Sequence, residues 1–165
     1  MARKIPETIT EEEFIVLLKR VPKKKRQHAL AYALGFYACL RISEVVNLKP
    51  DNIDKGQRII RIKQAKGNKD RNIPIPPELS KSLTNQLPIN LGARALQKSF
   101  KKIGLEVLNK DLHFHCLRHS GASHYLNKKK WSTRQVQVLL GHSKIQTTEI
   151  YTHVNPTDLI DLMYN

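Results

Sequence analysis

The feature that most constrains the fold is a helical spacing of apolar residues that runs along most of the chain and is interrupted once. Within residues 26–40 the apolar stripe has helical spacing and is formed by Leu30, Leu34, Tyr37 and Ala38. Residues 58–63 and 72–75 alternate instead, and the polar segment 64–71 joins them, which is typical of two strands in a β-hairpin or small meander. The pattern predicts a mainly α fold with a small antiparallel β-sheet (α+β).

Capping signals place several helix boundaries. Thr10 precedes three glutamates and is expected to cap a helix that runs to about Arg20. The apolar helix that follows the basic run 23–26 is expected to end near Leu40, and Ser43 to cap the next helix. Further helices are expected at about 78–85, 93–109, 115–129, 133–140, 146–153 and 157–164. At 165 residues, the chain is expected to form a single domain, 1–165.

The net charge of +15 makes a polyanion the expected partner. Nucleic acid is the leading candidate, an anionic membrane surface is the second, and a generally basic surface is the alternative. No apolar run approaches the roughly 20 residues that a membrane span needs, so no membrane insertion is expected. Cys39 and Cys116 lie in apolar surroundings without a CxxC pattern, which favours buried thiols in a reducing, cytoplasmic compartment.

Four segments carry residues suited to cleaving a phosphodiester, namely 40–44, 66–71, 115–119 and 140–151. Arg41 and Arg118 could clamp one phosphate, because a guanidinium grips phosphate oxygens bidentately and stays charged. His115 lies one helical turn before Arg118 and could shuttle a proton, and a lysine on a turn could protonate the leaving oxygen. A tyrosine becomes a nucleophile only where cations favour its phenolate.

A metal-free mechanism fits the composition. The acidic residues Asp51, Asp54, Asp111 and Asp158 are isolated rather than clustered, so neither a metal nor another cofactor is expected. A zinc cluster formed by His113, His115, His119 and His124 is the alternative. It is disfavoured because Arg118 would repel a cation and no cysteine pair completes the set.

The four segments resemble the conserved boxes of the tyrosine recombinase (phage integrase) family, most of all Xer-type recombinases. Residues 38–48 (ACLRISEVVNL) are similar to the first arginine box, and residues 66–75 (KGNKDRNIPI) to the lysine segment of a β-hairpin. Residues 115–124 (HCLRHSGASH) and 139–154 (LLGHSKIQTTEIYTHV) resemble the second and third boxes. Together the boxes imply the fold of the family's catalytic domain and an active site-specific DNA recombinase.

The resemblance implies a role for each matching residue. It implies that Arg41 and Arg118 stabilise the transition state, that His115 and His142 assist, and that Lys66 protonates the 5′-oxygen. It implies that Tyr151 is the nucleophile that forms a 3′-phosphotyrosyl link, and that Glu44 is an accessory acidic residue.

Alternatives remain for several of these positions. Tyr32 and Tyr37 lie on an apolar helix and are expected in the core, whereas Tyr125 and Tyr164 are weaker candidates for the nucleophile. Lys69 competes with Lys66 for the role of general acid. Lys69 and Arg71 are either DNA contacts or part of a solvated turn.

The resemblance also implies which domains and which partners to expect. The core-binding domain that usually precedes the catalytic domain is not expected in this sequence. Double-stranded DNA is the expected partner, and the protein is expected to self-associate on it into a tetrameric synapse. In this synapse the tail 157–164 is expected to dock on a neighbouring protomer. The alternative is that the tail folds back on its own chain. Competing functions are a type IB topoisomerase and a non-catalytic DNA-binding module.

Overall fold

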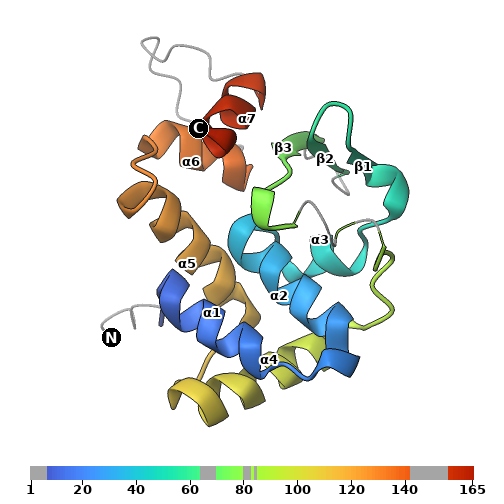
Figure 1. The fold of residues 1–165 in the computed structure, drawn as a ribbon, viewed down its shortest axis with the longest axis vertical. Helices are drawn as coiled ribbons and strands as arrows, with labels where there is room; N and C mark the ends of the chain where they lie inside the picture. Colours follow the sequence, from blue (N-terminus) through green and yellow to red (C-terminus); the bar gives the residue numbers. More distant parts are fainter. Residues whose placement is uncertain (1–6, 64–69, 80–82, 84, 142–155) are drawn as a thin grey trace, which may run out of the picture.

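The computed structural model describes residues 7–63, 70–79, 83, 85–141 and 156–165. The described elements follow the chain in Figure 1 as α1 (Glu11–Arg20), η1 (Lys23–Lys25), α2 (Arg26–Tyr37), α3 (Ile42–Val46), η2 (Pro50–Asn52), β1 (Ile53–Asp54), β2 (Ile59–Ile62), β3 (Arg71–Pro74), η3 (Pro77–Leu79), α4 (Ala93–Leu108), α5 (Phe114–Asn127), α6 (Thr133–Leu140) and α7 (Pro156–Tyr164). The prediction of a mainly α fold with a small antiparallel sheet is confirmed.

Helix α2 is the centre of the core, between α5 and α1 on one side and the sheet and α3 on the other (Figure 1). Its residues from Leu30 to Tyr37 are all buried. Gly121 on α5 allows the two helices to approach closely, because a Cβ at this position would overlap the Phe36 carbonyl oxygen. Phe14 of α1 stacks on Phe36 with ring centroids 4.4 Å apart. The close packing fixes the C-terminal end of α2, where the first arginine box begins.

The sheet has the strand order β1-β2-β3 and is antiparallel throughout. In its register Ile60 lies opposite Ile73, and Ile62 lies opposite Arg71. Ile60, Ile62 and Ile73 are buried on the face that the alternation predicts, and Ile59 and Pro74, which pair at the start of β2 and the end of β3, are buried as well. Helix α7 packs on β3 within the same chain, where the Tyr164 hydroxyl donates to the Ile75 carbonyl at 2.9 Å.

Some local predictions were wrong. Helix α2 ends at Tyr37 rather than near Leu40, because Cys39 adopts a left-handed backbone with φ of 52°. Ser43 lies inside α3, and the N-cap is Arg41, whose backbone N–H donates to the Glu44 carboxylate. The short strand β1 was not predicted. The helix expected at 78–85 has only η3 among its described residues, and the helix expected at 146–153 lies outside the described residues.

The other helix predictions agree with the structure to within a few residues. Thr10 caps α1 as a capping box with Glu13. Tyr32 and Tyr37 are core residues, and the free thiols of Cys39 and Cys116 are buried, all as predicted. None of the described helices is both long and apolar enough to cross a membrane.

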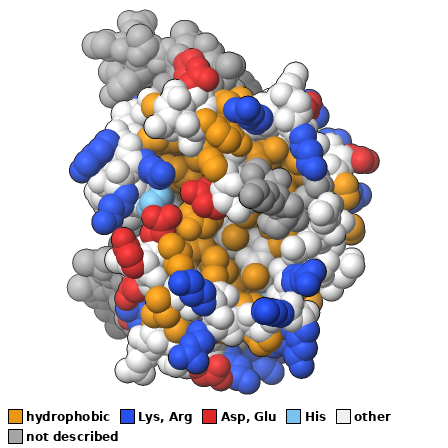
Figure 2. All heavy atoms as spheres, viewed as in Figure 1, with side chains coloured by type: hydrophobic (Ala, Val, Ile, Leu, Met, Phe, Trp, Pro, Cys, Tyr) orange, Lys and Arg blue, Asp and Glu red, His pale blue; other side chains and the backbone are white. Residues whose placement is uncertain are grey.

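The surface shows how the positive charge is distributed on one face. In Figure 2 hydrophobic side chains gather at the centre of the face, and lysine and arginine side chains are spread around its margin. The charge on this face is therefore dispersed rather than collected in one patch.

Candidate functional site

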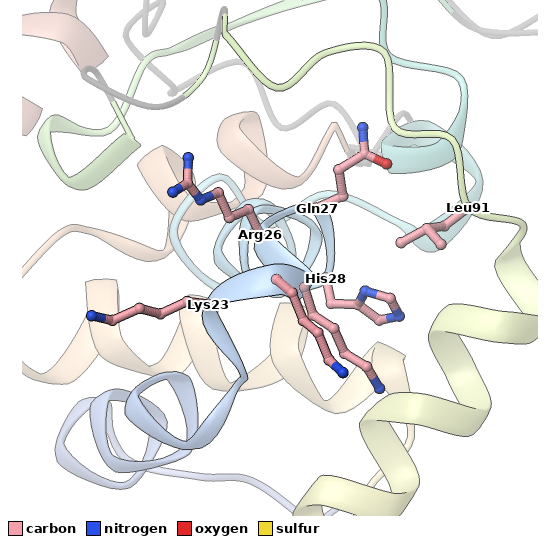
Figure 3. Close-up of a pocket in the computed structure, with 7 residues that line it drawn as sticks. Lys23, Arg26, Gln27, His28 and Leu91 are labelled. Carbon is pink, nitrogen blue, oxygen red and sulfur yellow. The ribbon is translucent and has the colours of Figure 1, made fainter.

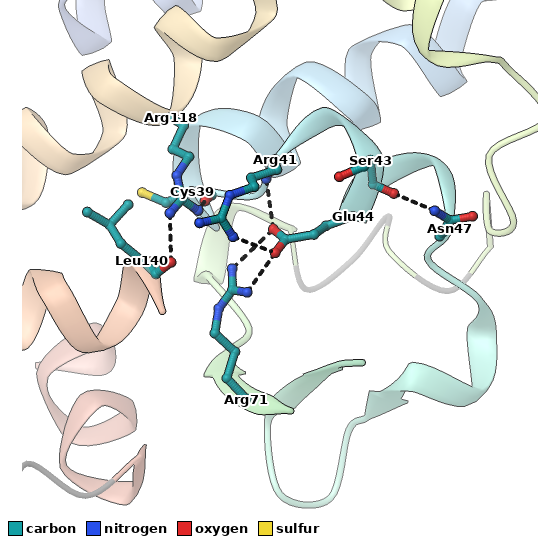
Figure 4. Close-up of polar contacts among 8 residues, drawn as sticks. All are labelled: Cys39, Arg41, Ser43, Glu44, Asn47, Arg71, Arg118 and Leu140. Atoms are coloured by element: carbon teal, nitrogen blue, oxygen red, sulfur yellow. Dashed lines mark hydrogen bonds and ion pairs between the residues drawn. The ribbon is translucent and has the colours of Figure 1, made fainter. Parts of the chain in front are cut away.

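Glu44 organises the first part of the site from the start of α3. Its carboxylate accepts the backbone N–H of Arg41 at 2.8 Å and the Arg41 guanidinium at 3.1 Å. The Arg71 guanidinium donates to both oxygens of the same carboxylate, at 2.6 and 3.1 Å. Figure 4 shows the two arginines reaching Glu44 from different elements, the α2–α3 connection and β3. One buried carboxylate therefore holds two cationic side chains.

Arg118 comes to the same place from α5. Its side chain is 4% exposed, and the guanidinium donates to the carbonyl oxygens of Cys39 and Leu140, both at 2.6 Å. The left-handed turn at Cys39 directs the first carbonyl, and the C-terminal end of α6 supplies the second. Arg118 thus joins α5 to the turn before Arg41 and to the residue that precedes Gly141. Figure 4 shows the Arg118 and Arg41 guanidinium groups lying side by side.

The charges of the cluster perturb one another. Burial, and then the neighbouring Arg41 and Arg71, lower the pKa of Arg118 to about 10, so this group still carries its charge at neutral pH. Burial raises the pKa of the Cys39 thiol to about 12, so this thiol stays protonated. Arg41 and Arg71 bind the Glu44 carboxylate, and Arg118 adds a third positive charge held by backbone carbonyls, which leaves an excess of positive charge suited to a phosphate group.

His115 lies one turn before Arg118 on α5, and its side chain reaches solvent. Its ring meets that of His119 edge to face, with centroids 4.4 Å apart. Partial desolvation lowers the pKa of His115, and the neighbouring His119, Arg118 and Arg41 lower it further. The imidazole is therefore neutral at physiological pH and can accept a proton.

Of the residues predicted for the site, the structure brings together Arg41, Glu44, Arg71, His115 and Arg118. Lys66, Lys69, His142 and Tyr151 lie outside the described residues. Of the competing tyrosines, Tyr125 is buried, and its hydroxyl donates to the Tyr37 carbonyl at 2.6 Å. The hydroxyl of Tyr164 is also engaged, with Ile75. The described tyrosines are thus core or packing residues, whereas the nucleophile prediction rests on Tyr151.

Sequence reasoning missed the contacts that fix the cluster. The spacing of Glu44 three residues after Arg41 is that of a capping box and could have indicated the first contact. No sequence signal indicates that Arg118 is bound by two backbone carbonyls. Arg71 was considered as a DNA contact or part of a solvated turn, and the structure places its guanidinium on Glu44 instead.

A separate basic hollow lies at the other end of α2. It is lined by Lys23, Lys24, Lys25, Arg26, Gln27, His28 and Leu91. Figure 3 shows Lys23 and Arg26 extending from the start of the helix, with His28 and Leu91 on the opposite side. The Gln27 amide donates to the carbonyls of Gln86 and Pro88, which anchors the hollow to the segment before α4. The hollow adds positive surface but no residue of the arginine cluster.

The part of the chain that the structure describes holds no group of three or more histidine, cysteine, aspartate or glutamate residues that could bind a metal ion. Two of the histidines considered for the alternative zinc cluster have other surroundings. His113 hydrogen-bonds Gln97 at 3.3 Å, and His124 is buried among aromatic rings.

Residues 7–158 match the phage integrase family. The chain belongs to the phage integrase family. Among curated members, the tyrosine recombinase XerC of Pseudomonas fluorescens is 34% identical over 93% of this chain, and a tyrosine recombinase of Thermosipho africanus is 35% identical over 96%. The tyrosine recombinase XerA of Thermococcus kodakarensis is 33% identical over 92%. The chain spans 58–61% of the length of these three integrase family members.

Two solved structures share the fold. The crystal structure of XerA recombinase aligns with a TM-score of 0.76 and 24% identity, covering 98% of this chain and 65% of that chain. Lambda integrase bound to DNA aligns with a TM-score of 0.68 and 16% identity, covering 90% of this chain and 61% of that chain. At these identities, the likeness supports the fold assignment.

Proposed function

We propose that this chain is the catalytic domain of a site-specific DNA recombinase that cleaves and rejoins DNA strands without a metal ion. The observation that carries the proposal is the convergence of Arg41 and Arg118, with His115 one turn away, in a chain of the phage integrase family that shares its fold with lambda integrase bound to DNA. Two guanidinium groups from separate elements suit the non-bridging oxygens of one phosphodiester.

In the proposed cleavage reaction each residue of the site has one task. The phenolic oxygen of Tyr151 attacks phosphorus, a P–O bond to the tyrosine forms, and the bond to the 5′-oxygen breaks. The proton of the phenol goes to His115, whose lowered pKa keeps its ring neutral beforehand. Lys66 gives a proton to the leaving 5′-oxygen, with Lys69 as its competitor. The reverse attack by a 5′-hydroxyl of a partner strand rejoins the DNA and releases Tyr151.

Arg41 and Arg118 act mainly on the transition state. The pentacoordinate phosphorus carries more negative charge on its oxygens than the starting diester, so fixed cations stabilise it preferentially. Both side chains are held before DNA arrives, Arg41 by Glu44 and Arg118 by two carbonyls. This preorganisation avoids a cost of reorientation during the reaction. His142 is proposed to assist at the same phosphate.

Double-stranded DNA is the proposed partner, with Lys69 as a backbone contact and a tetramer as the active assembly. Lambda integrase has been captured as a dimer on a core site, which supports assembly on DNA. In the described chain α7 packs on its own β3, and Leu159 is fully buried. Docking of α7 on a neighbouring protomer, as we propose for the assembly, requires release of these contacts. The buried free thiols fit a cytoplasmic location.

The test uses nicked duplex oligonucleotides with a randomised core. A nick close to the cleavage point lets the short cleaved fragment diffuse away, so a covalent protein–DNA adduct accumulates. We expect the wild-type chain to capture a defined sequence as an adduct in the presence of EDTA, and Tyr151→Phe to capture none. Equal adduct formation by Tyr151→Phe would remove Tyr151 as the nucleophile.

Two other results would change the functional assignment. Binding of duplex DNA with no adduct under any condition would indicate a non-catalytic binding module. Relaxation of supercoiled plasmid without strand exchange, measured on the same preparation with the captured site, would indicate a type IB topoisomerase.

A further inference from the structure

Arg71 occupies a junction between three segments of the proposed site. It is the first residue of β3 and lies opposite Ile62 in the sheet, so it stands at the base of the connection that carries Lys66. Its side chain is 10% exposed, whereas that of Arg61 on the same sheet is 44% exposed. A strand-end arginine directed inward to this extent is placed to bind protein groups rather than solvent.

The first contact of Arg71 is its bidentate ion pair with Glu44. The 2.6 and 3.1 Å bonds use both terminal nitrogens of the guanidinium and both carboxylate oxygens. The same carboxylate binds the backbone and side chain of Arg41. The end of β3 and the first catalytic arginine are therefore held on one shared anion.

The second contact is with Gly141, the residue after α6. Gly141 adopts a φ of 68°, and a Cβ at this position would lie 2.5 Å from Cδ and 2.7 Å from Nε of Arg71. The stem of Arg71 therefore lies directly against this turn, which leads to residues 142–155 and to Tyr151. One side chain links the lysine segment, the first arginine box and the entry to the tyrosine segment.

We propose that Arg71 is a positioning residue that anchors the Lys66 segment to the Glu44–Arg41 pair, instead of a contact to a DNA phosphate. The inference rests on the proposed function, because it assigns to Lys66 the protonation of the leaving 5′-oxygen. Arg71 acts through the fork geometry of its guanidinium, which a lysine cannot reproduce. A contact to a DNA phosphate, in contrast, would contribute to DNA affinity and to the salt dependence of binding.

The test compares Arg71→Lys with Arg61→Gln, a matched control on the same sheet whose exposed arginine pairs with Asp54. The single-turnover rate of adduct formation is measured at saturating DNA on the site captured by the wild-type chain. We expect Arg71→Lys to slow cleavage by about 10- to 100-fold, because small misplacements of catalytic groups cost this much. We expect its DNA affinity and the salt dependence of binding to be unchanged, and Arg61→Gln to cleave normally.

A second substrate separates positioning of Lys66 from a general structural defect. It carries sulfur at the 5′-bridging position, and a thiol with a pKa of about 8.5 leaves without a proton donor. Most of the rate lost by Arg71→Lys should return on this substrate, as it should for Lys66→Ala. Circular dichroism verifies that each variant is folded. Arg71→Gln is a second variant that also removes the charge.

Three results would overturn the positioning role. The first is cleavage by Arg71→Lys at the wild-type rate. The second is a rate loss in Arg71→Lys that persists on the sulfur substrate, although Lys66→Ala recovers on it. The third is a salt dependence of DNA binding that falls by about one phosphate contact in Arg71→Gln. Failure of the wild-type chain to form any adduct is a different result, because it refutes the proposed function itself.

Discussion

Substitution of Glu44 by glutamine removes the anion on which the described cluster depends. Glu44 is 7% exposed, and its carboxylate accepts bonds from the Arg41 backbone, the Arg41 side chain and the Arg71 side chain. Glutamine keeps the size of the side chain but has one acceptor oxygen and no charge. The substitution therefore leaves Arg71 largely buried without its counter-ion.

The expected loss can be estimated from the burial of the partners. Removing one member of a buried ion pair costs about 3–5 kcal/mol, because the other charge stays desolvated. Arg41 is 41% exposed and can recruit water, so only the Arg71 pair contributes fully. We expect a loss of about 3 kcal/mol in the free energy of unfolding. For a domain of this size the melting temperature should fall by about 6–12 °C.

The assay is urea denaturation at neutral pH, with Asp54→Asn as the matched control. Asp54 pairs with Arg61 at 2.6 Å, but this pair is far more exposed, so its loss should cost less than about 1 kcal/mol. A loss for Glu44→Gln no larger than that of Asp54→Asn would refute the view that Glu44 is the structural anchor of the arginines.

Two further predictions concern buried polar groups in the core. Tyr125→Phe removes the hydroxyl that donates to the Tyr37 carbonyl at 2.6 Å, and the free energy of unfolding in urea should fall by about 1–2 kcal/mol; no change would mean that the bond contributes nothing. Burial lowers the pKa of His124, so the folded state holds its ring neutral, and stability should decline as the pH falls below about 6.5, where the unfolded chain binds the proton. In His124→Gln the stability lost between about pH 7.5 and about pH 5.5 should be smaller, and an equal loss would assign the acid sensitivity to another group.

Local patterns predicted much of the fold. The helical stripe of α2 and the alternation of β2 and β3 were sufficient to predict those elements, since each pattern reports the buried face of one element. The cap at Thr10 was correct because a capping box is complete within four residues. The cap at Ser43 was wrong because the carboxylate of Glu44 binds the Arg41 N–H instead, and both arrangements are compatible with the sequence.

Fewer features of the candidate site than of the fold could be predicted from the sequence. Arg41, His115 and Arg118 were identified from their segments, and the structure brings them together. The partner of Arg71 could not be predicted, because Glu44 is 27 residues away in the sequence and only the tertiary fold brings the two side chains together. The carbonyls that bind Arg118 also could not be predicted, because every residue has one and the sequence does not say which are directed inward.

The most direct test of the central claim is the identity of the residue that becomes attached to DNA. The wild-type adduct, trapped on the captured site in EDTA, is digested with nuclease and protease, and the peptide that retains nucleotides is sequenced by mass spectrometry. We predict a single modified peptide in which Tyr151 is linked to a 3′-phosphate. Attachment at any other residue, or through a 5′-phosphate, would contradict the proposed mechanism.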